Sequence, residues 1–201
     1  MDYLSVIEML NACHGPSGDE RQIATTLKRL AEPYADTCHI DTLGNLIVHK
    51  KGPGPKVMFA AHMDSIGVVA TYIDEKGFIR FAQVGGLFKG DLINIQVRFA
   101  GGTRGVISYE EKTPFKDITL DNLFIDIGAA DRADAERQVQ IGDFAVFDAP
   151  RFEQNGVLCG PYLDNRIGCV TLLLVMERLA QQEIENDLYF AFTAQEEVGL
   201  R

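Results

Sequence analysis

The sequence predicts an α/β fold that is interrupted by a second, β-rich unit. Two short apolar runs, residues 57–61 and 188–192, are each flanked by turn-forming residues, which is typical of strands buried in a sheet. Apolar residues at helical spacing occupy segments that precede each of these runs. Between the two runs, residues 71–160 alternate short β-type segments with glycines, which favours a small barrel or sandwich.

The N-terminal segment predicts two helices followed by a β-hairpin. The first helix is expected to end near residues 14–16, where glycine and proline stop helices. The next segment, from Ser17 to Glu20, matches the S-x-x-E capping box and predicts the start of an amphipathic helix. Residues 40–50 then contain two β-type runs, with a turn at Gly44-Asn45.

The α/β pattern continues on both sides of the β-rich unit. Residues 57–61 are predicted to form a strand that is buried on both faces. Residues 166–182 carry apolar side chains at helical spacing, and either Asp164 or Asn165 would cap this helix. A second buried strand is expected at residues 188–192.

These elements divide the chain into three segments and two domains. Residues 1–70 would form the first part of an α/β domain, and residues 161–201 its second part. The inserted unit would be a small β-barrel-like domain at residues 71–160, with one helix near residues 131–140.

Composition narrows the class of protein. The formal net charge of −10 argues against nucleic acid and against an anionic membrane surface as partners. The N-terminus lacks the basic start and apolar core of a signal peptide, and no stretch is long enough to span a membrane. The spacing of the four cysteines matches neither a zinc knuckle nor a disulfide framework, so we expect reduced thiols in a cytoplasmic protein.

Three short polar motifs each lie next to the end of a predicted strand or the start of a predicted helix. The segments 61–64 and 195–199 each follow a predicted buried strand, and the segment 163–166 opens a predicted helix. In open α/β sheets, ligands bind outside the carboxyl ends of the strands. One sheet could therefore bring all three motifs to the same edge.

The residue types in these motifs suit a centre with two divalent metal ions. Zinc, cobalt and manganese accept imidazole and carboxylate ligands, and a pair of ions needs a bridging carboxylate. His62 and Glu197 are candidate ligands of the two ions, with Asp164 as the bridge. Asp64 is placed to orient His62, directly or through a shared peptide. Glu196 is then the candidate general base.

Each motif alone has an ordinary explanation. A His-x-Asp sequence arises often by chance, a Glu-Glu pair is usually solvated, and Asp-Asn before a helix is usually a cap. The combination of the three, in this order and at these positions, is far more specific than any one of them.

The same segments resemble a known family. The sequences AHMDSIG, LDNRIG and TAQEEVGLR look like the signature segments of M42 aminopeptidases, also called glutamyl or deblocking aminopeptidases. The opening HGPSGDE is similar as well, as is the stretch LFIDIGA in the predicted insertion. The resemblance extends over essentially the whole chain.

The resemblance implies a fold and a set of roles. The fold would be an α/β/α zinc-peptidase-like catalytic domain with an inserted β-barrel-like domain used in oligomer contacts. His62 would bind the first metal and be oriented by Asp64, Asp164 would bridge two zinc, cobalt or manganese ions, Glu197 would bind the second, and Glu196 would be the general base. The substrates would be peptides with a free N-terminus, and the protein would form homo-oligomers, from dimers to twelve-subunit particles.

One departure from the family pattern and three rival interpretations remain. Members of the family continue beyond the Glu-Glu segment with a further Asp and a further His ligand, whereas this chain ends at Arg201. We therefore expect a catalytic domain that is truncated on its C-terminal side, which leaves the activity of this chain alone open. The rivals are another two-metal hydrolase of the M20 or M28 type, a non-catalytic assembly subunit, and, least favoured, a glycosidase with paired carboxylates.

Overall fold

The computed structural model describes residues 1–199, which fold into two compact units. The first unit joins Met1–Ser65 to the chain from Tyr162 onward, and the second is Ile66–Pro161. The first unit contains α1 (Tyr3–Ala12), α2 (Arg21–Ala31), the 3-10 turn η1 (Glu32–Tyr34), β1 (Thr37–Ile40), β2 (Leu46–Lys50), β3 (Lys56–His62), α5 (Leu163–Leu179), β12 (Asp187–Thr193) and the 3-10 turn η4 (Glu196–Val198).

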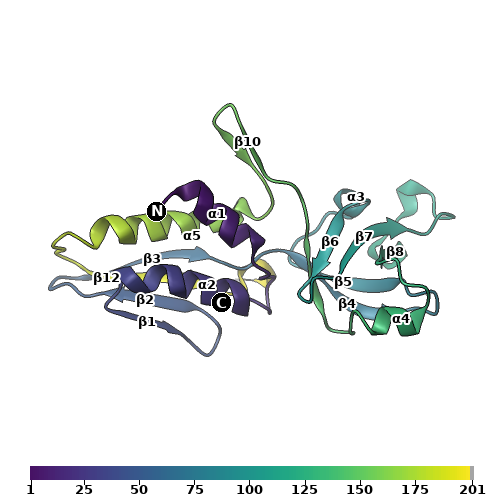
Figure 1. Ribbon diagram of the computed structural model, residues 1–201, viewed down its shortest axis with the longest axis horizontal. Coiled ribbons are helices and arrows are strands. Elements are labelled where there is room, and N and C mark those ends of the chain that lie inside the picture. The colour runs from purple at the N-terminus through teal and green to yellow at the C-terminus, as the bar shows by residue number, and fades with distance from the viewer. Residues whose placement is uncertain (200–201) are drawn as a thin grey trace. The chain divides into compact units, whose positions relative to one another are not determined.

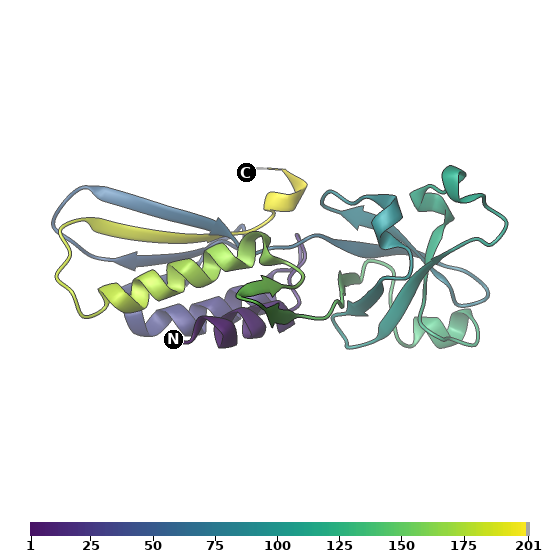
Figure 2. The same ribbon diagram turned by 90° about the horizontal axis from the view of Figure 1, so that it is seen from above.

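A four-stranded sheet forms the centre of the first unit, with the strand order β1-β2-β12-β3. β12 runs antiparallel to β2 and parallel to β3. The helices α1, α2 and α5 lie on one side of this sheet (Figure 2). The core between them is closed by fully buried side chains of both layers, namely Leu10, Ile23, Leu27, Leu46, Val48, Leu173, Phe190 and Phe192.

The prediction that β3 is buried on both faces is wrong for the described part of the chain. β3 lies at the edge of the sheet and pairs only with β12. Met58 and Phe59 are 68% and 43% exposed, because the described helices cover one face of the sheet (Figure 2) and β3 has a neighbouring strand on one side only. Only the end of the strand, at Ala61 and His62, is buried. β12 has a strand on each side and is buried over most of its length, as the sequence predicts.

The second unit is a closed barrel with the strand order β4-β5-β8-β7-β6-β9 (Figure 1). Its elements are β4 (Gly67–Ile73), β5 (Ile79–Val84), α3 (Lys89–Leu92), β6 (Gln96–Phe99), β7 (Arg104–Tyr109), η2 (Phe115–Asp117), η3 (Leu120–Asn122), β8 (Leu123–Asp126), α4 (Arg132–Glu136), β9 (Phe144–Phe147) and the hairpin β10 (Phe152–Gln154) and β11 (Val157–Cys159). Alternate side chains of the strands fill the interior, as barrel closure requires. The sequence-based expectation of a small β-barrel inserted into an α/β fold is thus confirmed.

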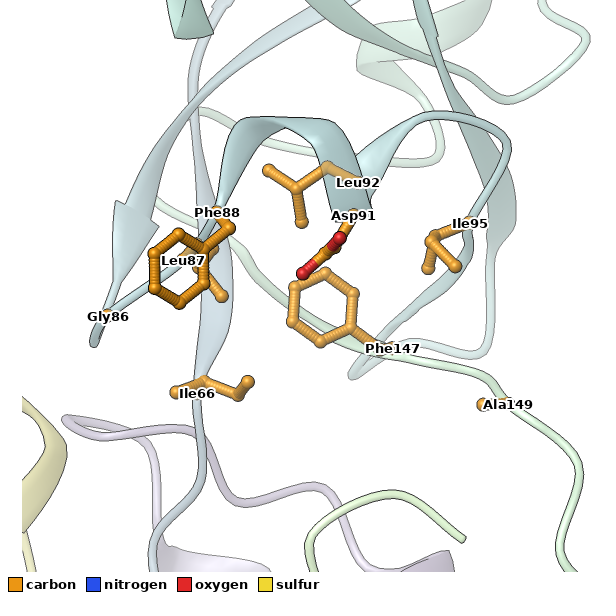
Figure 3. Close-up of a pocket in the computed structure, with 9 residues that line it drawn as sticks. All are labelled: Ile66, Gly86, Leu87, Phe88, Asp91, Leu92, Ile95, Phe147 and Ala149. Atoms are coloured by element: carbon orange, nitrogen blue, oxygen red, sulfur yellow. The ribbon is translucent and has the colours of Figure 1, made fainter.

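An apolar pocket of about 240 Å³ opens on the barrel unit (Figure 3). Leu87, Phe88 and Phe147 line it, and Asp91 is its single acidic side chain. None of the three polar motifs contributes a residue to this pocket. Separately, no helix within residues 1–199 has both the length and the apolar character needed to cross a bilayer.

Candidate metal centre

Parallel pairing of β3 with β12 brings two of the three motifs side by side. Thr193 is the register partner of His62, and the Met63 N–H donates to the Thr193 carbonyl at 2.9 Å. Both strands end here, so the residues that follow leave the sheet at the same edge. Gln195 has a left-handed backbone with φ of 61°, which turns the chain sharply into η4.

The third motif reaches the same edge from the start of α5. Asp164 and Asn165 have non-helical backbone angles, and the Asn165 side chain accepts the Gly168 N–H at 3.2 Å. Asn165 is therefore the residue that caps the continuous part of the helix, which confirms one of the two predicted caps. Asp164 is left outside the helical hydrogen bonding, with a side chain that is 91% exposed and an Oδ1 that lies 3.1 Å from His62 Nε2.

The structure brings all the predicted site residues together around His62. Its Nε2 lies 3.1 Å from Asp164 Oδ1 and 3.8 Å from Glu196 Oε2. One ligand atom from each of His62, Glu196 and Glu197 can be chosen so that all lie within 4.8 Å of one another. Carboxylates from two separate motifs thus converge on a single imidazole.

Asp64 is fully buried and contacts the His62 ring on the side of its Nδ1. The His62 Nδ1 is 3.3 Å from the Asp64 carbonyl oxygen and 3.5 Å from its Oδ1. A carbonyl oxygen can only accept, so Nδ1 carries the hydrogen and Nε2 is the nitrogen that faces the other carboxylates. This arrangement fixes the ring in the orientation that a metal ligand needs.

Hydrogen bonds, burial and neighbouring charges shift three pKa values in the cluster. The Asp64 carboxylate, helped by Asp164, raises the pKa of His62 to about 9 although burial lowers it. Burial also raises the pKa of Asp64, but hydrogen bonds from His62, Ser17 and the Glu197 N–H outweigh it and hold the pKa below its ordinary value. For Glu197, burial raises the pKa, and the nearby carboxylates raise it further against the effect of His62.

The donor set fits divalent transition metals. One imidazole nitrogen and several carboxylate oxygens are the ligands that zinc, cobalt and manganese accept. The carboxylates outnumber the imidazole, so the cluster carries an excess of negative charge. Removal of the His62 proton by a bound cation would leave Nε2 as a free ligand.

The sequence-based interpretation of residues 17–20 as a capping box is wrong. α2 begins at Arg21, and no side chain caps its N-terminus. The Ser17 hydroxyl instead donates to Asp64 Oδ2 at 2.5 Å, and the Glu20 carboxylate accepts the backbone N–H groups of Gly18 and Gln195. Two polar side chains that the sequence assigned to a helix end therefore form hydrogen bonds that support the cluster around His62.

Removal of the Ser17 hydroxyl is expected to destabilise the first unit. Ser17 is buried and its hydrogen bond has a charged acceptor, so Ser17→Ala should cost about 1.5–3 kcal/mol of unfolding free energy. Ser5→Ala is the matched control, because the Ser5 hydroxyl also donates to a carboxylate, that of Asp2, but in an exposed position. Urea unfolding in which both variants lose the same stability would contradict the buried role.

Comparison with known proteins shows the family to which the chain belongs. The M42 glutamyl aminopeptidase family matches residues 44–201. The chain belongs to this family. Among its relatives, a protein of Acetivibrio thermocellus is 42% identical over 201 residues, which cover all of this M42 chain and 60% of that protein. The lysyl aminopeptidase of Pyrococcus furiosus is 37% identical over 185 residues, which cover 86% of the chain and 53% of that enzyme.

Solved structures agree with this placement. An aminopeptidase from the archaeon Desulfurococcus kamchatkensis superposes with a TM-score of 0.93 at 33% identity, covering 99% of the M42 chain and 57% of that protein. The TET1 peptidase of Pyrococcus horikoshii, which can assemble into a tetrahedron or a large octahedral shell, gives a TM-score of 0.90 at 34% identity, with 98% and 62% covered. The chain thus spans between 53% and 62% of the length of these four relatives.

Proposed function

We propose that this M42 chain carries the metal centre of a two-metal aminopeptidase. His62 and Glu197 would each bind one zinc, cobalt or manganese ion, and Asp164 would bridge them. The observation that carries the proposal is the convergence of imidazole and carboxylate groups within 4.8 Å at the ends of two parallel strands. The carboxylates of three separate motifs around one imidazole form a donor set that divalent transition metals accept.

Each residue of the cluster would have a separate task in peptide hydrolysis. The bound metals would supply an acidified water and polarise the scissile carbonyl. Glu196 would accept the proton of the attacking water and pass it to the leaving amine. Asp64 would keep His62 in the required tautomer, through the contacts at its Nδ1. The substrate would present its free α-amine to one of the bound metals, so cleavage would start at the N-terminus.

The proposal extends to partners and location. The substrates would be peptides that are trimmed from their N-terminus. The chain would act in a homo-oligomer, by analogy with the TET1 peptidase and its closed shells. Action in the cytoplasm would agree with the reduced thiols that the spacing of the four cysteines predicts.

Metal content of the purified 201-residue protein tests the centre. After saturation with zinc or cobalt and removal of the excess, mass spectrometry is expected to find about two ions per chain, the number a bridged pair requires. His62→Ala should lose tightly held metal, because it removes the imidazole around which the carboxylates gather. His39→Ala is the control, because His39 is an exposed histidine outside the cluster.

The outcomes separate the candidate functions. Two ions that are lost on substitution of His62 support the aminopeptidase centre. Absence of tightly bound metal in the unmodified chain would contradict it and favour the rival interpretation, a non-catalytic assembly subunit. Metal that survives His62→Ala would show that the ions bind elsewhere.

A further inference from the structure

Three side chains from separate segments hold the backbone of the turn that carries the two glutamates. Each presents an oxygen that accepts a backbone N–H between residues 194 and 197. The three pairs are Asn45 Oδ1 with Ala194 N at 2.9 Å, Glu20 Oε1 with Gln195 N at 3.1 Å, and Asp64 Oδ2 with Glu197 N at 3.1 Å. We call these three acceptors the turn clamp.

Glu20 is the least expected member of the turn clamp. Its side chain is only 7% exposed, and a buried carboxylate is costly unless hydrogen bonds compensate for the lost water. Its Oε1 accepts two backbone N–H groups, from Gly18 at 2.8 Å and from Gln195 at 3.1 Å. Burial raises the pKa of Glu20 in spite of these bonds. Burial of this carboxylate therefore costs free energy, and one of the hydrogen bonds that offset the cost is to the Gln195 N–H of the turn.

The turn needs such support because of its backbone. Gln195 has φ of 61°, a left-handed conformation that costs free energy for a residue with a Cβ atom. The Glu20 bond to its N–H stabilises the turn at that residue. Beyond Gln195, the turn places Glu196 Oε2 3.8 Å from His62 Nε2. An extended chain at Gln195 would direct Glu196 and Glu197 elsewhere.

We propose that Glu20 and Asn45 are positioning residues of the metal centre, which fix the Glu196–Glu197 turn before any ion binds. Neither touches the ligand atoms; both act through the backbone of residues 194 and 195. The role of the turn in metal binding rests on the proposed function. The clamp itself can be tested without metal.

Amide hydrogen exchange of the metal-free chain, followed by NMR, tests the clamp directly. Glu20→Ala removes the acceptor, so exchange at Gln195 should become about 10- to 100-fold faster, the equivalent of one hydrogen bond to a charged group. Glu20→Gln keeps an Oε1 acceptor but loses its charge, so it should restore part of the protection, with exchange at Gln195 at least about threefold slower than in Glu20→Ala. In the same way, Asn45→Ala should accelerate exchange at Ala194.

Cobalt titration measures the consequence for the centre. Glu20→Ala should weaken cobalt binding about 10- to 100-fold and alter the visible spectrum of the bound ion, whereas Glu20→Gln should recover a large part of the affinity. Asp2→Ala controls for a general loss of stability. This substitution removes the Asp2 side chain, which caps α1 by accepting the Ser5 N–H and has no hydrogen bond to the turn. It should change neither the exchange at Gln195 nor the cobalt affinity.

The outcomes for the clamp and for the proposed function are distinct. Unchanged exchange at Gln195 in Glu20→Ala, equal acceleration in Asp2→Ala, or no rescue by Glu20→Gln would each overturn the clamp. Normal cobalt binding by Glu20→Ala would overturn its positioning role. Failure of the unmodified chain to bind cobalt would contradict the proposed function, while the exchange data would still decide whether the turn is held as described.

Discussion

Replacement of Glu196 by glutamine is expected to lower peptide turnover by about 10²–10⁴-fold in the metal-loaded protein, the contribution that a general base typically makes. The substitution keeps the size of the side chain and removes only its ability to take a proton. The initial rate of release of N-terminal residues from unblocked peptides measures the effect. N-acetylated peptides serve as the comparison, because cleavage of these in preference would favour a deacylase of the M20 or M28 type.

Metal binding separates the roles of the two adjacent glutamates. Glu196→Gln should hold metal as tightly as the unmodified chain, whereas Glu197→Gln should lose affinity, because the proposal makes Glu197 a ligand. Both side chains belong to the cluster around His62, and the metal affinity of the two variants reports which of them is the ligand. Equal loss of metal in both variants, or a Glu196→Gln protein that keeps more than about a tenth of the turnover, would contradict the assignment of Glu196 as the base.

Replacement of Arg166 by methionine is expected to destabilise the first unit by about 2–4 kcal/mol. The guanidinium is fully buried, and its Nη1 donates to the carbonyl oxygens of Leu10 at 2.6 Å and Cys13 at 3.2 Å, where α1 ends. It also lies over the Tyr162 ring, at 4.8 Å from the centroid. Methionine fills part of the volume but satisfies neither carbonyl, and a loss of this size is a large part of the stability of a typical domain.

Urea unfolding, followed by circular dichroism and by amide exchange in α1 and α5, measures this loss in the unit that contains Arg166. Site-resolved exchange is needed because a protein with two compact units need not unfold in one step. Arg178→Met is the matched control: Arg178 lies on the same helix but is exposed, and its loss should cost less than about 1 kcal/mol. Equal destabilisation by the two variants would contradict the role of the buried guanidinium.

The sequence was informative wherever the signal is local. The apolar run before His62 and the one before Glu196 each predicted a strand that ends at a polar motif, and both strands are present. Because parallel strands end at the same edge of a sheet, the meeting of these motifs could be expected without coordinates. Short β-type segments and the glycines between them likewise predicted a small barrel or sandwich, and the structure shows the barrel.

The sequence did not predict the hydrogen bonds between residues that are far apart along the chain. Ser17 and Glu20 matched a capping box by spacing, but their hydrogen bonds lead to Asp64, 47 residues away, and to Gln195, 175 residues away. Arg166 looked like part of a polar motif, yet its guanidinium binds the carbonyl of Leu10, 156 residues distant. No periodicity or local motif encodes such pairs.

The sequence by itself determined the fold class, the inserted β-rich unit and the five residues that meet at the candidate centre, because these follow from apolar periodicity and from polar residues at the ends of two strands and the start of a helix. Only the tertiary structure decided the edge position of β3 within residues 1–199, the burial of Arg166 and the clamp on the glutamate turn. Strand order and the pairing of distant polar groups depend on which surfaces pack together, and the free energy of that packing is a property of the whole folded unit.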